Sequence, residues 1–151
     1  MEKRNKSILV ALNESVSSRA VVDFLASMAL CPEDWDISLL HFFRKPSSSE
    51  LLMGKKFAAA QPSRLMNVLE KAKEKLVESG FIPEKIETEL VNEQYETIAD
   101  GIIDQANKRQ SSMVIIGRKN MSKAEEFVMG DISVKVIRAL DGAAVLVVKS
   151  K

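Results

Sequence analysis

Short apolar runs recur along the chain and are rich in strand-forming residues. Most of them are continuous, which is typical of strands buried on both faces of a parallel sheet. The four continuous runs are Ile8–Leu12, Ile37–Phe43, Met113–Ile116 and Ala144–Val148. A fifth run, Ile86–Val91, carries alternating polar residues, which favours an edge strand with one partly solvated face.

Between these runs, apolar residues recur every three or four positions, which predicts amphipathic helices. Serines at 15, 17 and 18 could cap the first helix. Gly80 stands after the second helix, where a C-terminus prefers glycine. The four helical stripes are Ala20–Met28, Leu65–Leu76, Ile98–Ala106 and Ile132–Leu140.

The alternation of strand and helix, closed by a last strand, predicts an α/β fold. Right-handed crossovers convert this order into a five-stranded parallel twisted sheet with helices on both faces. Such sheets bind ligands outside the carboxyl ends of their strands, near the switch in strand order. The loops after Leu12, Phe43, Val91 and Ile116 are therefore the places to expect a site. The segment from Pro46 to Pro62 is expected to be a long loop, and its role does not follow from its sequence.

Length and charge narrow the class of protein. A chain of 151 residues favours one domain, spanning 1–151. The 22 Lys and Arg nearly balance the 21 Asp and Glu, so we expect no nucleic-acid partner. The first apolar run is too short for a signal-peptide core or a membrane span. We therefore expect a cytoplasmic protein with no membrane partner.

The single cysteine and the single histidine supply little chemistry. Cys31 has no partner for an intramolecular disulfide and is expected to be a small buried hydrophobe. His41 lies inside a predicted strand and is expected to be a satisfied strand histidine, not a catalytic base. A metal site built from His and Cys lacks ligands. We predict no catalytic and no metal-ligating residues.

The most informative segment joins the fourth strand to the fourth helix. Gly117 follows the apolar run, where a glycine lets the backbone turn and approach a ligand closely. Gly130 precedes a predicted helix, whose first N–H groups and dipole favour an anion such as phosphate. Arg118 adds positive charge beside Gly117.

This segment resembles the loop of universal stress proteins, in which Gly is followed after two residues by Gly, and after nine more by Gly-Ser or Gly-Thr. Gly117 and Gly130 stand at the first and third glycines of that pattern. The first strand, the last helix and the last strand are also similar, so the resemblance covers essentially the whole chain. It implies a Rossmann-like, adenine nucleotide alpha hydrolase-like fold. The nucleotide-binding positions that it implies are Ala11, Asn13, Val91, Gly117, Arg118, Asn120, Gly130, Asp131, Ile132 and Ser133.

Three of these positions depart from the family pattern. Asn120 replaces the second glycine, and asparagine tolerates a left-handed backbone better than most residues. Asn13 replaces an aspartate and so loses its charge. Asp131 replaces the hydroxyl residue that would face the phosphates. Its carboxylate could cap the next helix and occupy the anion site itself, or it could hold a magnesium ion that bridges to phosphates; self-capping is the favoured alternative.

Two functions remain open. The first is a non-catalytic stress-response protein with a degenerate adenine-nucleotide pocket and no required cofactor, acting through protein partners. The resemblance implies that it dimerises through Ala144–Lys149, which would otherwise leave an apolar edge open. The second is an ATP- or ADP-binding switch that uses ATP with Mg and hydrolyses it slowly at most. No residue supplies a general base for a γ-phosphate, so efficient ATPase activity is expected under neither.

Overall fold

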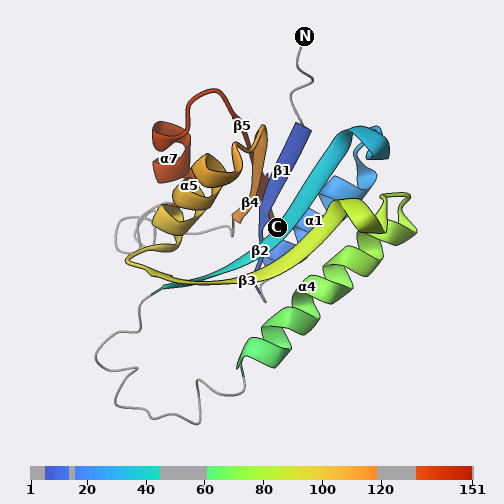
Figure 1. Ribbon diagram of the computed structural model, residues 1–151, viewed down its shortest axis with the longest axis horizontal. Helices are drawn as coiled ribbons and strands as arrows, with labels where there is room; N and C mark the ends of the chain where they lie inside the picture. The colour runs from blue at the N-terminus through green and yellow to red at the C-terminus, as the bar shows by residue number, and fades with distance from the viewer. Residues whose placement is uncertain (1–5, 14–15, 45–60, 119–131, 151) are drawn as a thin grey trace.

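The chain alternates strands and helices, as the sequence predicts (Figure 1). The structure is a computed structural model that describes residues 6–13, 16–44, 61–118 and 132–150. The elements are β1 (Lys6–Ala11), α1 (Val16–Ser27), β2 (Trp35–Arg44), α4 (Gln61–Glu78), β3 (Ile86–Tyr95), α5 (Ile98–Arg109), β4 (Met113–Arg118), α7 (Ile132–Ala139) and β5 (Ala144–Lys149). Single 3-10 turns at Pro32–Asp34 and Pro83–Lys85 precede β2 and β3. Within these ranges, no helix is long and apolar enough to cross a membrane.

The strands form one sheet in the order β3-β2-β1-β4-β5, and every neighbouring pair is parallel. From β1 the chain moves outward through β2 to β3, and then returns to the other side of β1 at β4. The strand order therefore switches between β1 and β4. The predicted five-stranded parallel sheet is confirmed, and so is the prediction that the strand beginning at Ile86 lies at an edge.

Helices cover both faces of the sheet (Figure 1). Successive side chains of a strand point to opposite faces, and β1 illustrates this. Ile8 and Val10 lie in the core shared with Leu25 of α1 and Leu69 of α4. Leu9 lies in the second core, which α5 and α7 cover. The side chains of β1 at positions 8 to 10 are almost completely buried, so β1 is the centre of the fold.

Two boundaries differ from the prediction. β3 does not end at Val91 but continues to Tyr95, because an edge strand can carry polar residues on its solvated side. Its pairing with β2 shifts register between Phe42 and Phe43, which lets the added residues pair with the end of β2. α4 begins at Gln61, so Pro62 lies in its first turn, where the missing proline N–H removes no helical bond. The predicted loop therefore ends before Pro62, and its residues 46–60 lie outside the described ranges.

The expectation that His41 is a satisfied strand histidine is confirmed, and the expectation that Cys31 is buried is wrong. His41 is half-buried, with Nδ1 2.9 Å from the carbonyl oxygen of Leu12 and its ring packed edge-on against Phe43. Cys31 is exposed, because it stands in the surface connection between α1 and β2, directly before a 3-10 turn that begins with Pro32.

Candidate functional site

The carboxyl ends of β1 and β4 lie side by side at the switch in strand order. Ala11, the last residue of β1, is opposite Ile116 of β4. β4 continues through Gly117 to Arg118, which pair with residues of β5. The topology therefore brings Ala11, Asn13, Gly117 and Arg118, all of them predicted site residues, to one edge of the sheet. This is the edge at which parallel α/β sheets bind ligands.

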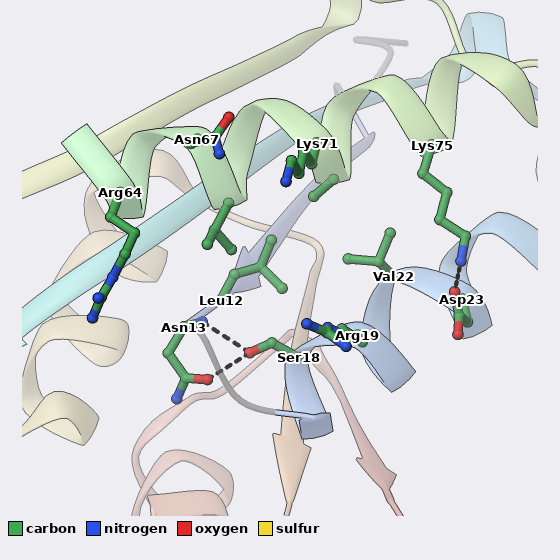
Figure 2. A pocket seen from close by; sticks show the side chains of 12 residues that line it. Leu12, Asn13, Ser18, Arg19, Val22, Asp23, Arg64, Asn67, Lys71 and Lys75 are labelled. Atoms are coloured by element: carbon green, nitrogen blue, oxygen red, sulfur yellow. Dashed lines mark hydrogen bonds and ion pairs between the residues drawn. The ribbon is translucent and has the colours of Figure 1, made fainter. Parts of the chain in front are cut away.

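Hydrogen bonds fix the chain just after β1. The N–H of Leu12 donates to the carbonyl oxygen of Leu40 at 2.9 Å, and the carbonyl of Leu12 accepts from His41. The hydroxyl of Ser18, in the first turn of α1, accepts from the N–H of Asn13 at 2.8 Å and donates to its Oδ1 at 2.9 Å (Figure 2). Ser18 is buried while Asn13 is exposed. The Asn13 side chain is thus held in one orientation at the ligand-binding edge.

Gly117 lies inside β4, not after it as predicted from the sequence. A β-carbon at this position would lie 2.7 Å from the carbonyl oxygen of Ser17 and 3.0 Å from Cγ2 of Val21. The close approach that this glycine permits is therefore to the first turns of α1. That contact sets the position of α1, and with it Ser18, against the end of β4.

Of the remaining predicted site residues, some lie within the described ranges and others lie outside them. Arg118 is half-buried, and its carbonyl oxygen accepts from the N–H of Ser150 at 3.0 Å. Ile132 and Ser133 form the start of α7; Ile132 is exposed and Ser133 is buried. Asn120, Gly130 and Asp131 lie outside the residues that the structure describes.

Val91 stands apart from the other predicted positions. It pairs with Phe42 of β2, and in the strand order β2 separates β3 from β1. Its side chain is buried in the core formed with Ala99 and Ile102 of α5. Because β3 continues to Tyr95, Val91 lies four residues before the carboxyl end of its strand. The register nevertheless places Val91 about level with Asn13 along the strands, two strands away, since Ala11 pairs with Leu40 and Phe42 pairs with Val91.

A cavity of about 530 Å³ opens beside Asn13, between α1 and α4 (Figure 2). We call it the α1–α4 groove. Its lining is Leu12, Asn13, Ser18, Arg19, Val22, Asp23, Arg64, Asn67, Val68, Lys71, Ala72 and Lys75. Its volume lies in the usual range of small-molecule sites. The wall formed by α4 was not predicted, because polar residues at helical spacing do not show which neighbouring helix they face.

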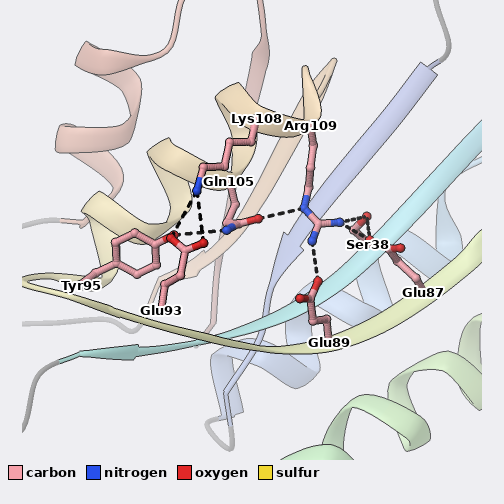
Figure 3. A network of polar contacts seen from close by, with 8 residues as sticks. All are labelled: Ser38, Glu87, Glu89, Glu93, Tyr95, Gln105, Lys108 and Arg109. Atoms are coloured by element: carbon pink, nitrogen blue, oxygen red, sulfur yellow. Dashed lines mark hydrogen bonds and ion pairs between the residues drawn. The ribbon is translucent and has the colours of Figure 1, made fainter.

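A polar network joins α5 to β3 on the other face of the sheet (Figure 3). The Tyr95 hydroxyl lies 2.7 Å from carboxylate oxygens of both Glu93 and Asp104. Burial raises the pKa of Tyr95 to about 12; the two carboxylates also raise it, while a hydrogen bond from Gln105 opposes them. Hydrogen bonds from Tyr95 and Lys108 lower the pKa of Asp104 below its ordinary value. These contacts hold α5 on the edge strand.

Arg109 extends this network along the same edge strand. Its guanidinium pairs with Glu87 and with Glu89, the latter at 2.6 Å, and it donates to the hydroxyl of Ser38 at 3.2 Å. Its Nε donates to Gln105. The described residues include no group of three or more His, Cys, Asp or Glu that could hold a metal ion. The contacts of Arg109 connect α5 with both β2 and β3.

The sequence matches the model of the Universal stress protein family over residues 4–149. A comparison with curated proteins finds no match. The universal stress protein UspA from Lactobacillus plantarum has a similar structure, with a TM-score of 0.70 and 13% identity, over 96% of this chain and 98% of that one. This similarity agrees with the predicted Rossmann-like α/β fold.

Two other similar structures contain a nucleotide. The universal stress protein from Archaeoglobus fulgidus, in complex with dAMP, has a TM-score of 0.61 and 18% identity, over 95% of this chain and 98% of that one. A family protein from Arabidopsis thaliana with AMP bound has a TM-score of 0.64 and 15% identity, over 97% and 92%. At such identities the structures establish the shared fold, and the match over residues 4–149 establishes the family. The chain belongs to the universal stress protein family.

Proposed function

We propose that this chain is a non-catalytic protein that binds an adenine nucleotide at the carboxyl ends of β1 and β4, and that its altered loop favours a monophosphate over ATP. The observation that carries the proposal is the pair of hydrogen bonds between Ser18 and Asn13, which fixes a polar side chain at the switch in strand order. Ligands of open α/β sheets bind at this place. The AMP and dAMP complexes of similar structures supply the chemical class.

The chemistry of Asn13 suits an uncharged part of the ligand. With Oδ1 accepting from Ser18, the amide nitrogen is the donor side of the side chain. Such a donor fits an acceptor atom of the adenosine part, either a ring nitrogen or a ribose oxygen. An aspartate at this position would only accept, so the exchange for Asn13 changes which ligand atoms fit without removing the polar contact.

The preference for a monophosphate rests on the charge of Asp131. By its resemblance to the family loop, this residue stands where a hydroxyl residue would face the phosphates. Two unit charges about 4 Å apart repel by about 1 kcal/mol in water and about 4 kcal/mol at an effective dielectric constant of 20. Each phosphate beyond the first adds negative charge, so ATP is penalised more than AMP. The same repulsion makes the pocket degenerate as an ATP site.

The variant Asp131→Ser tests this proposal. Removal of the carboxylate should raise the affinity for ATP by roughly tenfold or more, the equivalent of about 1.4 kcal/mol, and should change the affinity for AMP less. Isothermal titration calorimetry with both nucleotides, with and without magnesium, measures the two effects. A loss of magnesium-dependent ATP binding would instead identify Asp131 as a metal contact in an ATP-binding switch. Asp141→Ser is the control, because the exposed Asp141 precedes β5 at the opposite edge of the sheet.

We also propose that the protein is a homodimer that pairs through β5. β5 is an edge strand, and its residues Val145–Val148 are all apolar and only half-buried. An apolar edge strand is a template for pairing with another chain. Sedimentation equilibrium should therefore give twice the chain mass of 16.8 kDa, and a mass of one chain at micromolar concentration would contradict the dimer.

The family supports a role in the stress response, which we propose is exercised in the cytoplasm through protein partners. A non-catalytic protein should release no phosphate from ATP above the rate of a buffer control. A turnover that survives purification by two different chromatographic routes would contradict this part of the proposal.

A further inference from the structure

The described lining residues of the α1–α4 groove include more cationic than anionic side chains. Four cationic side chains line it: Arg19, Arg64, Lys71 and Lys75. Of the described lining residues, Asp23 is the one carboxylate, and it pairs with Lys75. Throughout the described ranges, no carboxylate pairs with Arg19 or Lys71. The groove is therefore an electropositive cavity with cations on both of its walls, Arg19 on α1 and Lys71 on α4.

The floor of the groove is apolar. Leu12, Val22 and Ala72 are buried beneath it, and Val68 is half-buried along α4. The lining residues of α4 run from Arg64 to Lys75, a rise of roughly 16 Å at 1.5 Å per residue. A ligand that fills such a groove needs an apolar body for the floor and a negative group for the rim.

The two ends of the groove differ. Arg64 extends from α4 toward Asn13 at one end, whereas Lys75 and Asp23 join the two helices at the other (Figure 2). The ion pair neutralises the positive charge at its own end. Arg19 and Lys71, which have no carboxylate partner among the described residues, therefore mark where the negative group of a ligand would be placed.

We propose that the α1–α4 groove is a second ligand site, which binds an amphipathic organic anion. Arg19 and Lys71 hold the negative head group, and Leu12, Val22 and Ala72 support the apolar body. The site is separate from the proposed nucleotide pocket because one wall is α4, which contributes none of the residues that the family loop implies. The two sites adjoin at Asn13 and Ser18, which line the groove.

The stability of the protein without a ligand does not account for the like charges of Arg19 and Lys71 on neighbouring helices. Like charges on neighbouring helices repel, and surface charge pairs contribute at most about 1 kcal/mol each. Loss of one such cation should therefore leave the stability of the ligand-free protein unchanged or slightly raised. A structural role would have the opposite sign, so the midpoint of thermal unfolding of Arg19→Gln without ligand separates the two.

The test uses anilinonaphthalene sulfonate, which combines an aromatic body with one negative group. Titration of the full chain, followed by fluorescence, should saturate at one probe per chain. Arg19→Gln and Lys71→Gln should each weaken binding by roughly tenfold, the size expected for one charge-assisted contact. Lys135→Gln, on α7 at the opposite face, is the matched control and should bind as the wild type does.

A second variant keeps the test independent of charge. Val68→Phe fills the groove from its half-buried wall, so it should block the probe while leaving every lining cation in place. Equal probe binding by the wild type, Arg19→Gln and Val68→Phe would overturn the proposal. So would a loss of unfolding temperature in Arg19→Gln without the probe.

Competition with AMP separates this site from the nucleotide pocket. Excess AMP should leave the affinity for the probe within about twofold, since head group and apolar body contact residues outside that pocket. Complete competitive displacement by AMP would show that the groove belongs to the nucleotide pocket and would overturn the second site. Failure of AMP to bind in calorimetry would contradict the proposed function and leave the result with the probe intact.

Discussion

Gly117 of β4 lies directly against the backbone carbonyl of Ser17 in α1: a β-carbon at position 117 would be 2.7 Å from that oxygen. Real β-carbons essentially never approach an atom so closely. The first turn of α1 therefore packs on β4 at the point where the strand order switches. The same turn carries Ser18, which holds Asn13. The candidate site thus depends on a glycine that contacts the helix.

The variant Gly117→Ala should destabilise the fold by about 1–3 kcal/mol, because the added methyl group forces α1 away from β4. It should also weaken AMP binding, because displacement of α1 carries Ser18 away from Asn13. Urea unfolding and calorimetry measure the two effects. Gly101→Ala is the control: its methyl group would meet side-chain atoms of Tyr95 and Phe42 on the other face, so it should cost stability without loss of AMP affinity. Wild-type behaviour of Gly117→Ala in both measurements would refute the packing argument.

The variant Ser18→Ala should lower the free energy of unfolding by about 1 kcal/mol, because it removes the hydroxyl that bonds twice to Asn13. Its effect on AMP affinity should exceed that of Ser27→Ala. Ser27 makes one bond to the carbonyl of Phe24 at the exposed end of the same helix, away from the site. Similar AMP affinities for the two variants would mean that the hydrogen bonds between Ser18 and Asn13 do not orient a ligand-binding group.

Tyr95 gives the fold a dependence on alkaline pH. Its pKa is about 12 in the folded protein and 10.0 in its ordinary state, so the folded state favours the protonated phenol. This contribution to stability is fully present below pH 10 and is lost as the pH rises from 10 toward 12. The difference in unfolding free energy between wild type and Tyr95→Phe should therefore shrink over this interval. Urea unfolding at constant ionic strength measures this difference. If the difference in unfolding free energy stays constant from about pH 8 to about pH 11.5, the raised pKa of Tyr95 is contradicted.

The sequence predicted the fold because buried strands need continuous apolar residues, and the strand-helix order limits the possible topologies. It failed where a strand needs only one apolar face. At Asn92, Glu93 and Gln94 the side chains are exposed. β3 nevertheless continues past Val91 because Phe43 and Arg44 of β2 pair with Gln94 and Tyr95, while Asn92 and Glu93 fall within the register shift. Pairing across the sheet decides that boundary.

The candidate site was predictable in part. The position of Asn13 followed from the end of the first strand, and serines near the first helix were expected as caps. That Ser18 bonds to Asn13 depends on the path of the intervening loop. The contact of Gly117 with Ser17 joins residues 100 positions apart. The groove forms because the fold brings together the two helices that carry Arg19 and Lys71. Such contacts leave no local pattern.

The most direct test of the central claim is thermal unfolding of the full chain with increasing AMP, beside parallel series with ATP, each with and without magnesium. A ligand at one hundred times its dissociation constant stabilises a protein by about 2.7 kcal/mol, which is several degrees for a domain of this size at roughly 2–4 °C per kcal/mol. The account predicts a saturating rise with AMP that does not need magnesium, and a smaller rise with ATP. A melting temperature that does not change up to millimolar AMP would contradict it.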